Sequence, residues 1–291
     1  MMSRYQIFTD ATADPIPELK AGLLPVEIIP MQIEIGGTEY LYGTSDGITA
    51  RRFYQLQREG NFASTSQITP MAYFQYFEPW LTQGTDILYL CFSSGMSGTF
   101  QSAMLAAEEL QQKYPERKII CIDTLCASGG EGFLVHETVQ MQAKGLDISS
   151  LAEWIMKYRL QVCHYFTVDT FTHLKHGGRV SAATAAMGTA LHIKPLLHVN
   201  NEGKLESIGK SHGRKKAISG LLNRIEQGWM PELGKFVLIA HADAQEDAKI
   251  LESYIKERFP DTSICIGEVG PIIGAHTGPG MLSLFYWGNN R

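Results

Sequence analysis

Short apolar runs alternate with helical patterns in the first half of the chain, and this alternation restricts the choice of fold more than any other feature. The runs at residues 5–8, 87–92 and 118–122 have the length of buried strands. Helical patterns at residues 100–114 and 131–144 follow the second and third runs. Strands that alternate with helices predict βαβ units around a parallel sheet. Ligands of such sheets bind outside the carboxyl ends of the strands, so the polar loops after the three runs are expected to meet at one crevice.

The second half has a different pattern. Residues 196–199 and 204–208 flank the sequence Asn-Asn-Glu-Gly, which is typical of a hairpin. The other expected strands are residues 161–168, 236–240 and 262–266, and the expected helices are residues 214–226 and 244–259. We therefore predict an α/β protein with two domains. An N-terminal α/β domain with a parallel sheet flanked by helices covers residues 1–159, and a C-terminal α+β domain with a mixed or antiparallel sheet covers residues 160–291.

The composition is that of an ordinary globular chain, with 44% hydrophobic and 19% charged residues. Its formal net charge is −5 and its pI is about 6.0. Nucleic-acid-binding domains present a basic face, so this balance argues against general nucleic-acid binding. Two local basic clusters, at residues 175–179 and 214–216, are either solvated surface or sites for a phosphate or a partner.

The cysteines and the apolar segments indicate a cytoplasmic protein. The five cysteines are odd in number and include no C-x-x-C pair, which favours reduced thiols over a disulfide framework or a zinc ribbon. The N-terminal residues contain no apolar run of signal-peptide length. No segment approaches the roughly 20 apolar residues of a membrane span. Any contact with a membrane is expected to be peripheral or transient.

Three short catalytic motifs each fail at one position. The glycine-rich stretch that starts at Gly203 has five residues between its glycines, where the phosphate loop has four. The serine-hydrolase elbow has a glycine where this chain has Thr99, and a hydrolase that uses Ser97 remains open. The metalloprotease helix that starts at His136 has Gln140 in place of its second histidine. There is no G-x-G-x-x-G fingerprint either, and we expect no metal and no cofactor.

A serine-rich turn at residues 93–99 is the strongest candidate site. It stands between a predicted strand and a predicted helix, where free N–H groups and the helix dipole bind anions. Simple helix capping by serine or threonine is the competing interpretation. The same alternatives apply to the hydroxyl-rich residues 63–67, which precede a helix expected from Met71. Residues 270–280 are predicted to form a glycine-rich loop, in which His276 either contacts an anion or is an ordinary buried histidine.

Six segments, in order along almost the whole chain, resemble the motifs of the DegV family. The serine-rich turn Ser-Ser-Gly-Met-Ser-Gly-Thr-Phe, for example, is similar to the family's Ser-Ser-Gly-Leu-Ser-Gly-Thr-Tyr. The matching segments are residues 8–14, 65–67, 93–100, 175–181, 192–195 and 275–280. Two positions differ from the family pattern, because Ala11 replaces a serine and Ile68 stands where proline often follows Thr-Ser-Gln.

The resemblance implies a cytoplasmic fatty-acid-binding protein that is not itself an enzyme. In bacteria, proteins of this kind present the carboxyl group of a long-chain fatty acid to an ATP-dependent fatty-acid kinase, which forms an acyl phosphate. By this resemblance Thr65 and Ser97 hold the carboxylate, Ser94 and the nearby His276 belong to the same carboxylate-binding site, and Arg179 serves kinase docking or the phosphoryl step. The acyl chain would occupy an apolar tunnel between the two domains. No residue is expected to be catalytic, and the fatty acid is the only expected ligand.

Two other hypotheses stay open at this stage. The first is a serine esterase or thioesterase, with Ser97 as nucleophile and His276 as base. The second is a regulatory module that binds another protein through the basic clusters around Arg179 and Arg214.

Overall fold

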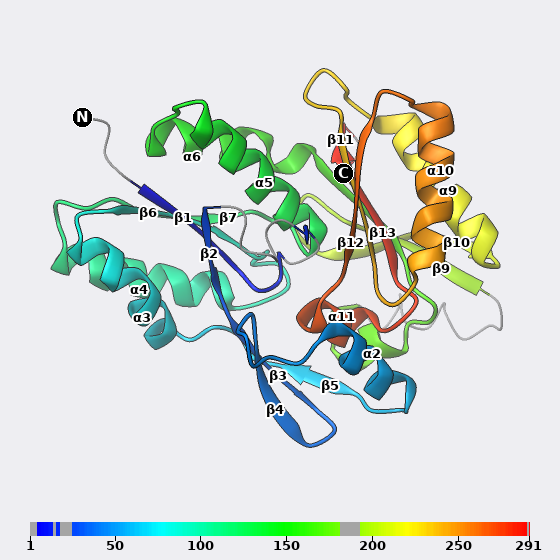
Figure 1. Ribbon diagram of the computed structural model, residues 1–291, viewed down its shortest axis with the longest axis horizontal. Helices are drawn as coiled ribbons and strands as arrows, with labels where there is room; N and C mark the ends of the chain where they lie inside the picture. The colour runs from blue at the N-terminus through cyan, green and yellow to red at the C-terminus, as the bar shows by residue number, and fades with distance from the viewer. Residues whose placement is uncertain (1–4, 14–15, 18–24, 181–192, 290) are drawn as a thin grey trace.

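The computed structural model describes residues 5–13, 16–17, 25–180, 193–289 and 291 (Figure 1). Three β-sheets form its frame, and helices fill the space between and around them. The motif residues Asp14, Ser181 and His192 lie outside the described residues.

Sheet A contains the three strands expected in the first half of the sequence and one more. Its strand order is β2-β1-β6-β7, and all three pairs are parallel. The strands are β1 (Tyr5–Asp10), β2 (Val26–Ile29), β6 (Asp86–Cys91) and β7 (Ile119–Asp123). Every residue of β6 is buried, as in a central strand that helices cover on both faces. The prediction of a parallel sheet is confirmed.

Four helices cover sheet A. Figure 1 shows α3 (Pro70–Thr82) and α4 (Thr99–Lys113) on one side, and α5 (Gly129–Ala143) and α6 (Ile148–Tyr158) on the other. The sequence predicted α4 and α5 to within two residues at each end. α3 starts at Pro70, directly after Thr69, whose Oγ1 accepts a hydrogen bond from the N–H of Ala72 at 3.3 Å. A threonine cap followed by proline is a favourable helix start. The threonine hydroxyl accepts a hydrogen bond from a backbone N–H of the first turn, and proline has no N–H that would be left unpaired there.

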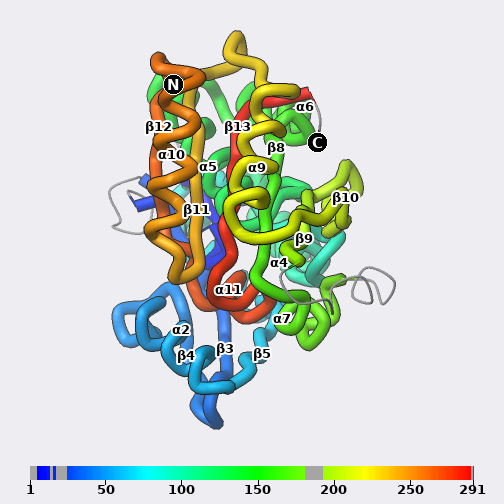
Figure 2. The backbone as a smooth tube through the Cα atoms, turned by 90° about the vertical axis from the view of Figure 1, so that its right-hand side faces the viewer, coloured from blue at the N-terminus to red at the C-terminus, as the bar shows by residue number. Residues whose placement is uncertain are grey.

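Sheet C belongs to the second half and is mixed, as predicted. Its order is β10-β9-β8-β13-β11-β12, and only the β11–β12 pair is parallel. The strands are β8 (Val162–Thr167), β9 (Ile193–Val199), β10 (Leu205–His212), β11 (Phe236–His241), β12 (Ser263–Glu268) and β13 (Leu282–Trp287). A short 3-10 helix, η1 (Arg159–Gln161), precedes β8. Figure 2 shows α9 (Arg214–Gly228) and α10 (Gln245–Arg258) on the outer face of this sheet.

Sheet B and its neighbouring helices were not predicted. The sheet has the order β4-β3-β5 and is antiparallel, with strands β3 (Met31–Ile35), β4 (Thr38–Tyr42) and β5 (Ala63–Thr65). α2 (Ala50–Arg58), α7 (Thr172–His176) and α11 (Pro271–Thr277) lie at the same end of the molecule (Figure 2). α11 contacts α2, α7, β3 and β5, and so joins the second half of the chain to sheet B.

The prediction of a loop over residues 270–280 is wrong at residues 271–277, which form α11. Pro271 occupies the first turn of this helix, where its fixed φ is favourable and its missing N–H costs nothing. Six of the seven residues of α11 are buried, so tertiary packing stabilises a helix that is too short to be stable alone. The unusual backbone is confined to Gly278 and Gly280, which follow the helix with φ of +72° and +87°.

Helix α5 lies between sheets A and C and packs on both. It contacts β6 on one side and β8, β11 and β13 on the other (Figure 1). Its first turn has no side chains where sheet C comes closest. A Cβ atom on Gly129 would lie 2.4 Å from the Phe285 ring, and one on Gly130 would lie 1.8 Å from Nε2 of His164. These two glycines therefore permit the close approach of α5 to β8 and β13.

One hydrophobic core crosses the boundary between the two halves. Phe133 of α5 packs against Phe236 and Trp287, with ring centroids 5.2 and 5.1 Å apart. A second apolar cluster lies between the outer face of sheet C and helices α9 and α10. Sheets A and B use residues before 160 and sheet C uses residues after 160. The division into domains 1–159 and 160–291 stays a prediction, because the shared core ties the halves together.

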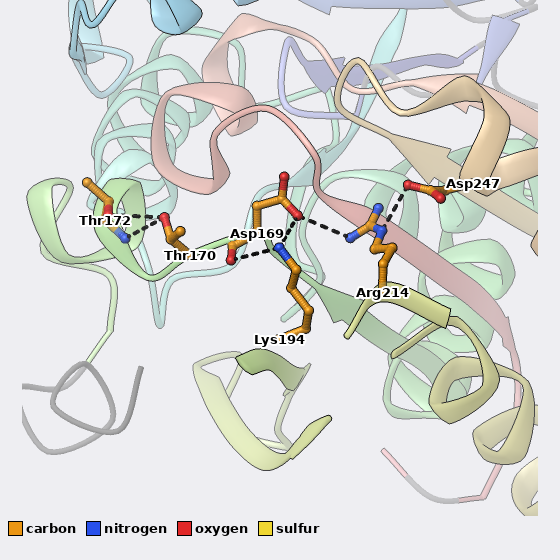
Figure 3. A network of polar contacts seen from close by, with 6 residues as sticks. All are labelled: Asp169, Thr170, Thr172, Lys194, Arg214 and Asp247. Carbon is orange, nitrogen blue, oxygen red and sulfur yellow. Dashed lines mark hydrogen bonds and ion pairs between the residues drawn. The ribbon is translucent and has the colours of Figure 1, made fainter. Parts of the chain in front are cut away.

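A chain of charged side chains fixes the segment after β8 (Figure 3). Asp169 accepts a hydrogen bond from Lys194 Nζ of β9 at 2.7 Å and lies 3.8 Å from a terminal nitrogen of Arg214. Arg214, the first residue of α9, donates from Nε to Asp247 of α10 at 2.8 Å. Three elements of the second half, β9, α9 and α10, are thus linked to the segment in which the chain leaves β8 for α7.

Candidate functional site

A cavity lies between the two halves of the chain. Its volume is about 270 Å³, compared with the roughly 10–15 Å³ that one water molecule needs. Most of its wall is apolar, with side chains from both halves that include Phe92, Met96, Phe166, Leu174, Ile273 and Phe285. Of the predicted site residues, Thr65, Ser97, Arg179 and His276 line it and Ser94 does not. The cavity therefore has the size and the lining of a site for an amphipathic molecule.

Thr65 and His276 meet at one end of the cavity, although they are 211 residues apart in the sequence. Thr65 ends strand β5, and His276 belongs to α11, which packs against β5. The distance between Thr65 Oγ1 and His276 Nε2 is 2.9 Å. If the neutral imidazole donates its Nε2 proton to Thr65 Oγ1, the threonine hydroxyl can still donate its own proton to another acceptor.

Burial keeps His276 neutral. The pKa of its imidazole is lowered to about 4, mainly by burial, with smaller contributions in the same direction from the neighbouring Arg179 and His176. The ring is enclosed on its other side by Gly177, where a Cβ atom would lie 2.1 Å from Nδ1. His276 therefore acts at neutral pH as a hydrogen-bonding group and not as a cation.

The serine-rich turn contributes Ser97 to the same end of the cavity. Ser97 Oγ lies 2.8 Å from Thr99 Oγ1 and accepts a hydrogen bond from the backbone N–H of Thr99 at 3.2 Å, next to the start of α4. The segment with Thr65 packs directly on this turn, because a Cβ atom on Gly98 would lie 2.2 Å from Gln67 Oε1. Two hydroxyl-rich helix starts therefore converge at one end of the cavity.

The first two serines of the turn have other roles. Ser93 is buried and donates to the carbonyl oxygen of Gly203, in the β9–β10 hairpin, at 2.7 Å. Ser94 is exposed and donates from Oγ to Asp123 at 2.5 Å. Ser94 therefore lies apart from the hydroxyls that line the cavity, and Ser93 holds the two halves of the chain together.

Arg179 lies at the rim of the same end. It is exposed, and its guanidinium group donates to the carbonyl oxygens of Met96 and Gly177. Met96 precedes Ser97, and Gly177 contacts His276. A positive charge is thus held beside the polar end of the cavity and remains accessible from outside.

The geometry does not favour the esterase hypothesis. A nucleophilic serine needs a base within hydrogen-bonding reach. Here His276 Nε2 lies 2.9 Å from Thr65 Oγ1, and Ser97 Oγ lies 2.8 Å from Thr99 Oγ1. Among the described residues, the hydroxyl of Ser97 therefore has a threonine as its neighbour and no base within hydrogen-bonding reach.

Two buried carboxyl groups next to the cavity, those of Asp10 and Glu131, were not predicted from the sequence. Thr12 Oγ1 lies 2.5 Å from Asp10 Oδ1 and 2.6 Å from Glu131 Oε2. A hydroxyl group has one proton, so one of these contacts requires a protonated carboxyl group. Burial raises the pKa of Asp10, against the opposing effect of hydrogen bonds from Thr12, Phe92 and Tyr89. These groups tie the end of β1 to β6 and α5 under the cavity wall.

The two departures from the family motifs are both accommodated by packing. Ala11 is 2% exposed, and its methyl group lies close to Gly43. Ile68 is 4% exposed and belongs to the main hydrophobic core. The hydroxyl-rich segment before Ile68 keeps its place on the cavity wall, since Thr65, Ser66 and Gln67 all line it.

No group of three or more His, Cys, Asp or Glu side chains among the described residues is arranged to hold a metal ion. No helix in the described part of the chain has the length and apolar character needed to span a membrane. The five cysteines are all free thiols.

Comparison with known proteins identifies the family. The family model for uncharacterised proteins of the DegV type matches residues 4–289. The chain belongs to the DegV family. A DegV domain-containing protein from Clostridium perfringens is 39% identical over 290 residues, which cover 100% of this chain and 99% of that protein.

Solved structures of DegV proteins have the same fold. A DegV family protein from Thermus thermophilus, described for its fatty-acid binding, matches with a TM-score of 0.86 at 29% identity and covers 98% of this chain and 100% of its own. The fatty acid kinase (Fak) B3 protein of Streptococcus pneumoniae, solved with linoleic acid, matches with a TM-score of 0.86 and the same coverage. Its 20% identity shows the common fold alone.

Three polar cavity residues of this DegV protein lie outside the segments that were matched to the family motifs: Ser128, His164 and Ser283. A signal for one of them was present, because Ser128 stands three residues before Glu131 at the start of a helix, in the spacing of a capping box. His164 lies within an apolar strand and carried no signal.

Proposed function

We propose that this chain binds a long-chain fatty acid, with the carboxylate between Thr65 and Ser97 and the acyl chain along the apolar wall. The observation that carries the proposal is a cavity with hydroxyl groups at one end and apolar side chains from both halves beyond them. A carboxylate buried without partners would cost several kcal/mol, so donors at the head of the site are required. Each buried CH₂ group then contributes about 0.8 kcal/mol to binding.

Thr65 and His276 suit the head of such a site. A neutral His276 donates from Nε2 to Thr65 Oγ1, and the Thr65 hydroxyl then donates to the carboxylate. The imidazole fixes the direction of this donor, because Nε2 and Oγ1 are 2.9 Å apart. Hydrogen bonds to an ionised acceptor are stronger than those between neutral groups. Ser94 is left out of the proposed site, since its hydroxyl binds Asp123.

We further propose that a partner kinase uses the bound fatty acid. An oxygen of the carboxylate would attack the γ-phosphorus of ATP on the kinase, the bond to ADP would break, and an acyl phosphate would result. Arg179 would then interact with the kinase or with the transferred phosphoryl group, because its accessible guanidinium fork suits phosphate oxygens. The chain itself would act as a cytoplasmic binding protein without catalytic residues.

Extraction of the purified protein with organic solvent, followed by mass spectrometry, tests the binding proposal. We expect a long-chain fatty acid in the extract, and uptake of added fatty acid by delipidated protein. Combined Thr65→Ala and Ser97→Ala substitutions should weaken uptake by roughly tenfold or more, since charge-assisted hydrogen bonds contribute about 1.5–3 kcal/mol. The matched control is Ser94→Ala, which removes a hydroxyl from the same turn outside the cavity. An empty protein that takes up no fatty acid would refute the proposal.

The same protein tests the kinase step through a second readout. With a purified fatty-acid kinase and ATP, acyl phosphate formation should depend on this chain. Arg179→Glu should abolish that reaction while fatty acid still binds. A loss of fatty-acid binding instead would place Arg179 in the head of the pocket.

A further inference from the structure

The cavity has a second polar region, away from Thr65 and His276. Alternate residues of a strand face the same side, and His164 and Phe166 of β8 line the cavity beside Phe285 and Ser283 of β13. β8 runs from His164 towards α7, and β13 starts just after α11, so the head with His276 adjoins the pair Phe166–Ser283 first. The pair His164–Phe285 lies deeper. At this depth the wall is completed by the start of α5, where Ser128 lines the cavity.

Ser128 has a buried hydroxyl group that the protein itself does not use. The residue is 3% exposed, and no described polar atom lies within hydrogen-bonding distance of its Oγ. It occupies the cap position of the 15-residue helix α5 without making a capping hydrogen bond. Glu131, the partner that a capping box would use, accepts hydrogen bonds from Thr9 and Thr12 instead. A hydroxyl that stabilises neither the helix nor a neighbour is available to a ligand in the cavity.

The backbone of Ser128 supports the same conclusion. Its φ is +52° and its ψ is −131°, a conformation that residues with a side chain rarely adopt. Glycine would fit this position without strain. Serine adds only a hydroxymethyl group, which the position holds against the cavity at the positive end of the α5 dipole.

His164 closes the wall beside this hydroxyl group. Its Nδ1 lies 2.7 Å from the carbonyl oxygen of Val162, so Nδ1 carries the proton. Burial lowers the pKa of His164 well below its usual value, and Nε2 of the neutral ring accepts a hydrogen bond from the N–H of Ala127, the residue before Ser128, at 3.4 Å. Gly130 packs against the same atom, since a Cβ atom there would lie 1.8 Å from it. Both ring nitrogens are therefore engaged, and the Ser128 hydroxyl is the polar group at this depth that has no partner among the described residues.

We propose that Ser128 forms a second subsite, beside the ring of His164, which binds a hydroxyl group on the acyl chain, and that the ligand class of this protein includes hydroxy fatty acids. A hydroxyl group both donates and accepts, so it can pair with the Ser128 hydroxyl, which can also do either. An unsubstituted chain would leave the Ser128 hydroxyl unpaired against CH₂ groups, a loss that lowers its relative affinity. This inference rests on the proposed function and adds the substrate class to it.

The test compares stearic acid with a series of hydroxystearic acids, with the hydroxyl on successive carbons from mid-chain to the end. Affinities for the delipidated full-length protein are measured by calorimetry or by displacement of a fluorescent fatty acid. At least one positional isomer should bind roughly tenfold more tightly than stearic acid, the gain of about one buried hydrogen bond. The isomer with the largest gain measures how far Ser128 lies from the carboxylate.

Substitution of Ser128 ties the preference to its hydroxyl. Both Ser128→Ala and Ser128→Gly should bring the affinity ratio of the preferred isomer to stearic acid close to one. The glycine variant covers the case in which alanine is not tolerated at positive φ. Ser283→Ala is the matched control, because Ser283 lines the cavity but its hydroxyl already donates to Ala240 O at 3.0 Å, and its ratio should stay as in the native protein.

The outcomes separate this inference from the proposed function. Tight binding of stearic acid with no isomer preferred would overturn the hydroxyl subsite and leave fatty-acid binding intact. A preference that survives both Ser128 substitutions would overturn the assignment to Ser128. Failure of every probe to bind would overturn both proposals together.

Discussion

At the scale of single residues, the pair Thr65 and His276 shows how burial makes a histidine a neutral hydrogen-bonding group. Burial removes the stabilisation that water gives to an imidazolium, and nearby Arg179 and His176 repel a further positive charge. The neutral ring can still donate to Thr65. The head of the cavity is therefore a set of oriented hydrogen bonds, with the fixed charge of Arg179 at the rim.

A pH dependence of stability follows from the lowered pKa of His276. Its folded-state pKa is about 4 and its usual value is 6.5, so the unfolded chain binds more protons between these values. The free energy of unfolding should fall as the pH drops from 6.5 towards 4, with up to about 3 kcal/mol from this residue. Chemical denaturation of the delipidated protein across this range measures the slope.

His276→Gln is the comparison that isolates this contribution. Glutamine retains a side chain that can donate to Thr65 but has no proton to gain in this range. The buried His164 and the half-buried His173, whose pKa values are also lowered, add the same slope to both proteins. The native protein should lose more stability than the variant on acidification, and parallel curves would contradict the lowered pKa of His276.

Sequence reasoning predicted individual cavity residues where a local pattern marked them. The hydroxyl-rich helix starts at Thr65 and Ser97 were visible, and the family resemblance paired them with His276 and Arg179. It placed Ser94 in the same site, whereas the Ser94 hydroxyl donates to Asp123. The unpaired hydroxyl of Ser128 was not predicted, because contacts distant in sequence decide which hydrogen bonds a side chain leaves unused.

At the scale of helices and strands, the sequence predicted most of sheets A and C and several of their helices, and missed sheet B, α2, α6, α7 and α11. Sheet A, sheet C, α4 and α5 have clear apolar periodicity over many residues. Sheet B was missed although Met31, Ile33 and Ile35 alternate with polar residues before a Gly-Gly turn, which is a hairpin signal. The sequence around α11 was assigned to a loop because it is rich in glycine and proline, which are unfavourable in helices. The helix has only seven residues, and packing against α2, α7 and sheet B stabilises it.

The charged chain in Figure 3 leads to a prediction about how these elements are held together. Asp169→Ala should lower the free energy of unfolding by about 1–3 kcal/mol, because Lys194 and Arg214 would face each other without their shared carboxylate. Their side chains are only 21% and 20% exposed, so water compensates poorly. Urea denaturation measures the loss.

An exposed ion pair on α10 provides the control for this prediction. Glu246 and Lys249 are 3.3 Å apart, but their side chains are 85% and 57% exposed. Glu246→Ala should barely change the unfolding transition, since exposed pairs contribute little. Equal effects of Asp169→Ala and Glu246→Ala would show that the network does not hold the elements.

At the scale of the whole molecule, the cavity exists because the two halves meet. Its wall combines the ends of β1, β5, β6 and β7 with β8, β13, α11 and the β9–β10 hairpin. The sequence predicted that such a tunnel lies between two domains only through the family resemblance. Local patterns could not show it, because they do not specify how sheet C approaches α5.

The contact between the serine-rich turn and the β9–β10 hairpin gives the last prediction. Gly95 packs so closely on the hairpin that a Cβ atom would lie 2.6 Å from Glu202 O and 2.8 Å from Gly203 O. Gly95→Ala must therefore displace the hairpin, whose residues Val199 and Leu205 line the cavity. We expect a loss of about 1–3 kcal/mol in the free energy of unfolding, typical of overpacking. We also expect weaker fatty-acid binding, because the second half of the wall shifts.

Gly209→Ala separates this contact from a general effect of replacing glycine. Gly209 lies in β10 of the same hairpin, and no heavy atom is within 4 Å of the position that its Cβ would take. Denaturation and fatty-acid affinity are measured for both variants. Gly209→Ala should match the native protein in both, while Gly95→Ala should lose stability and affinity together. A Gly95→Ala protein with lower stability but native affinity would mean that the hairpin can move without changing the cavity, and the wall would then be set by sheet C and α5 alone.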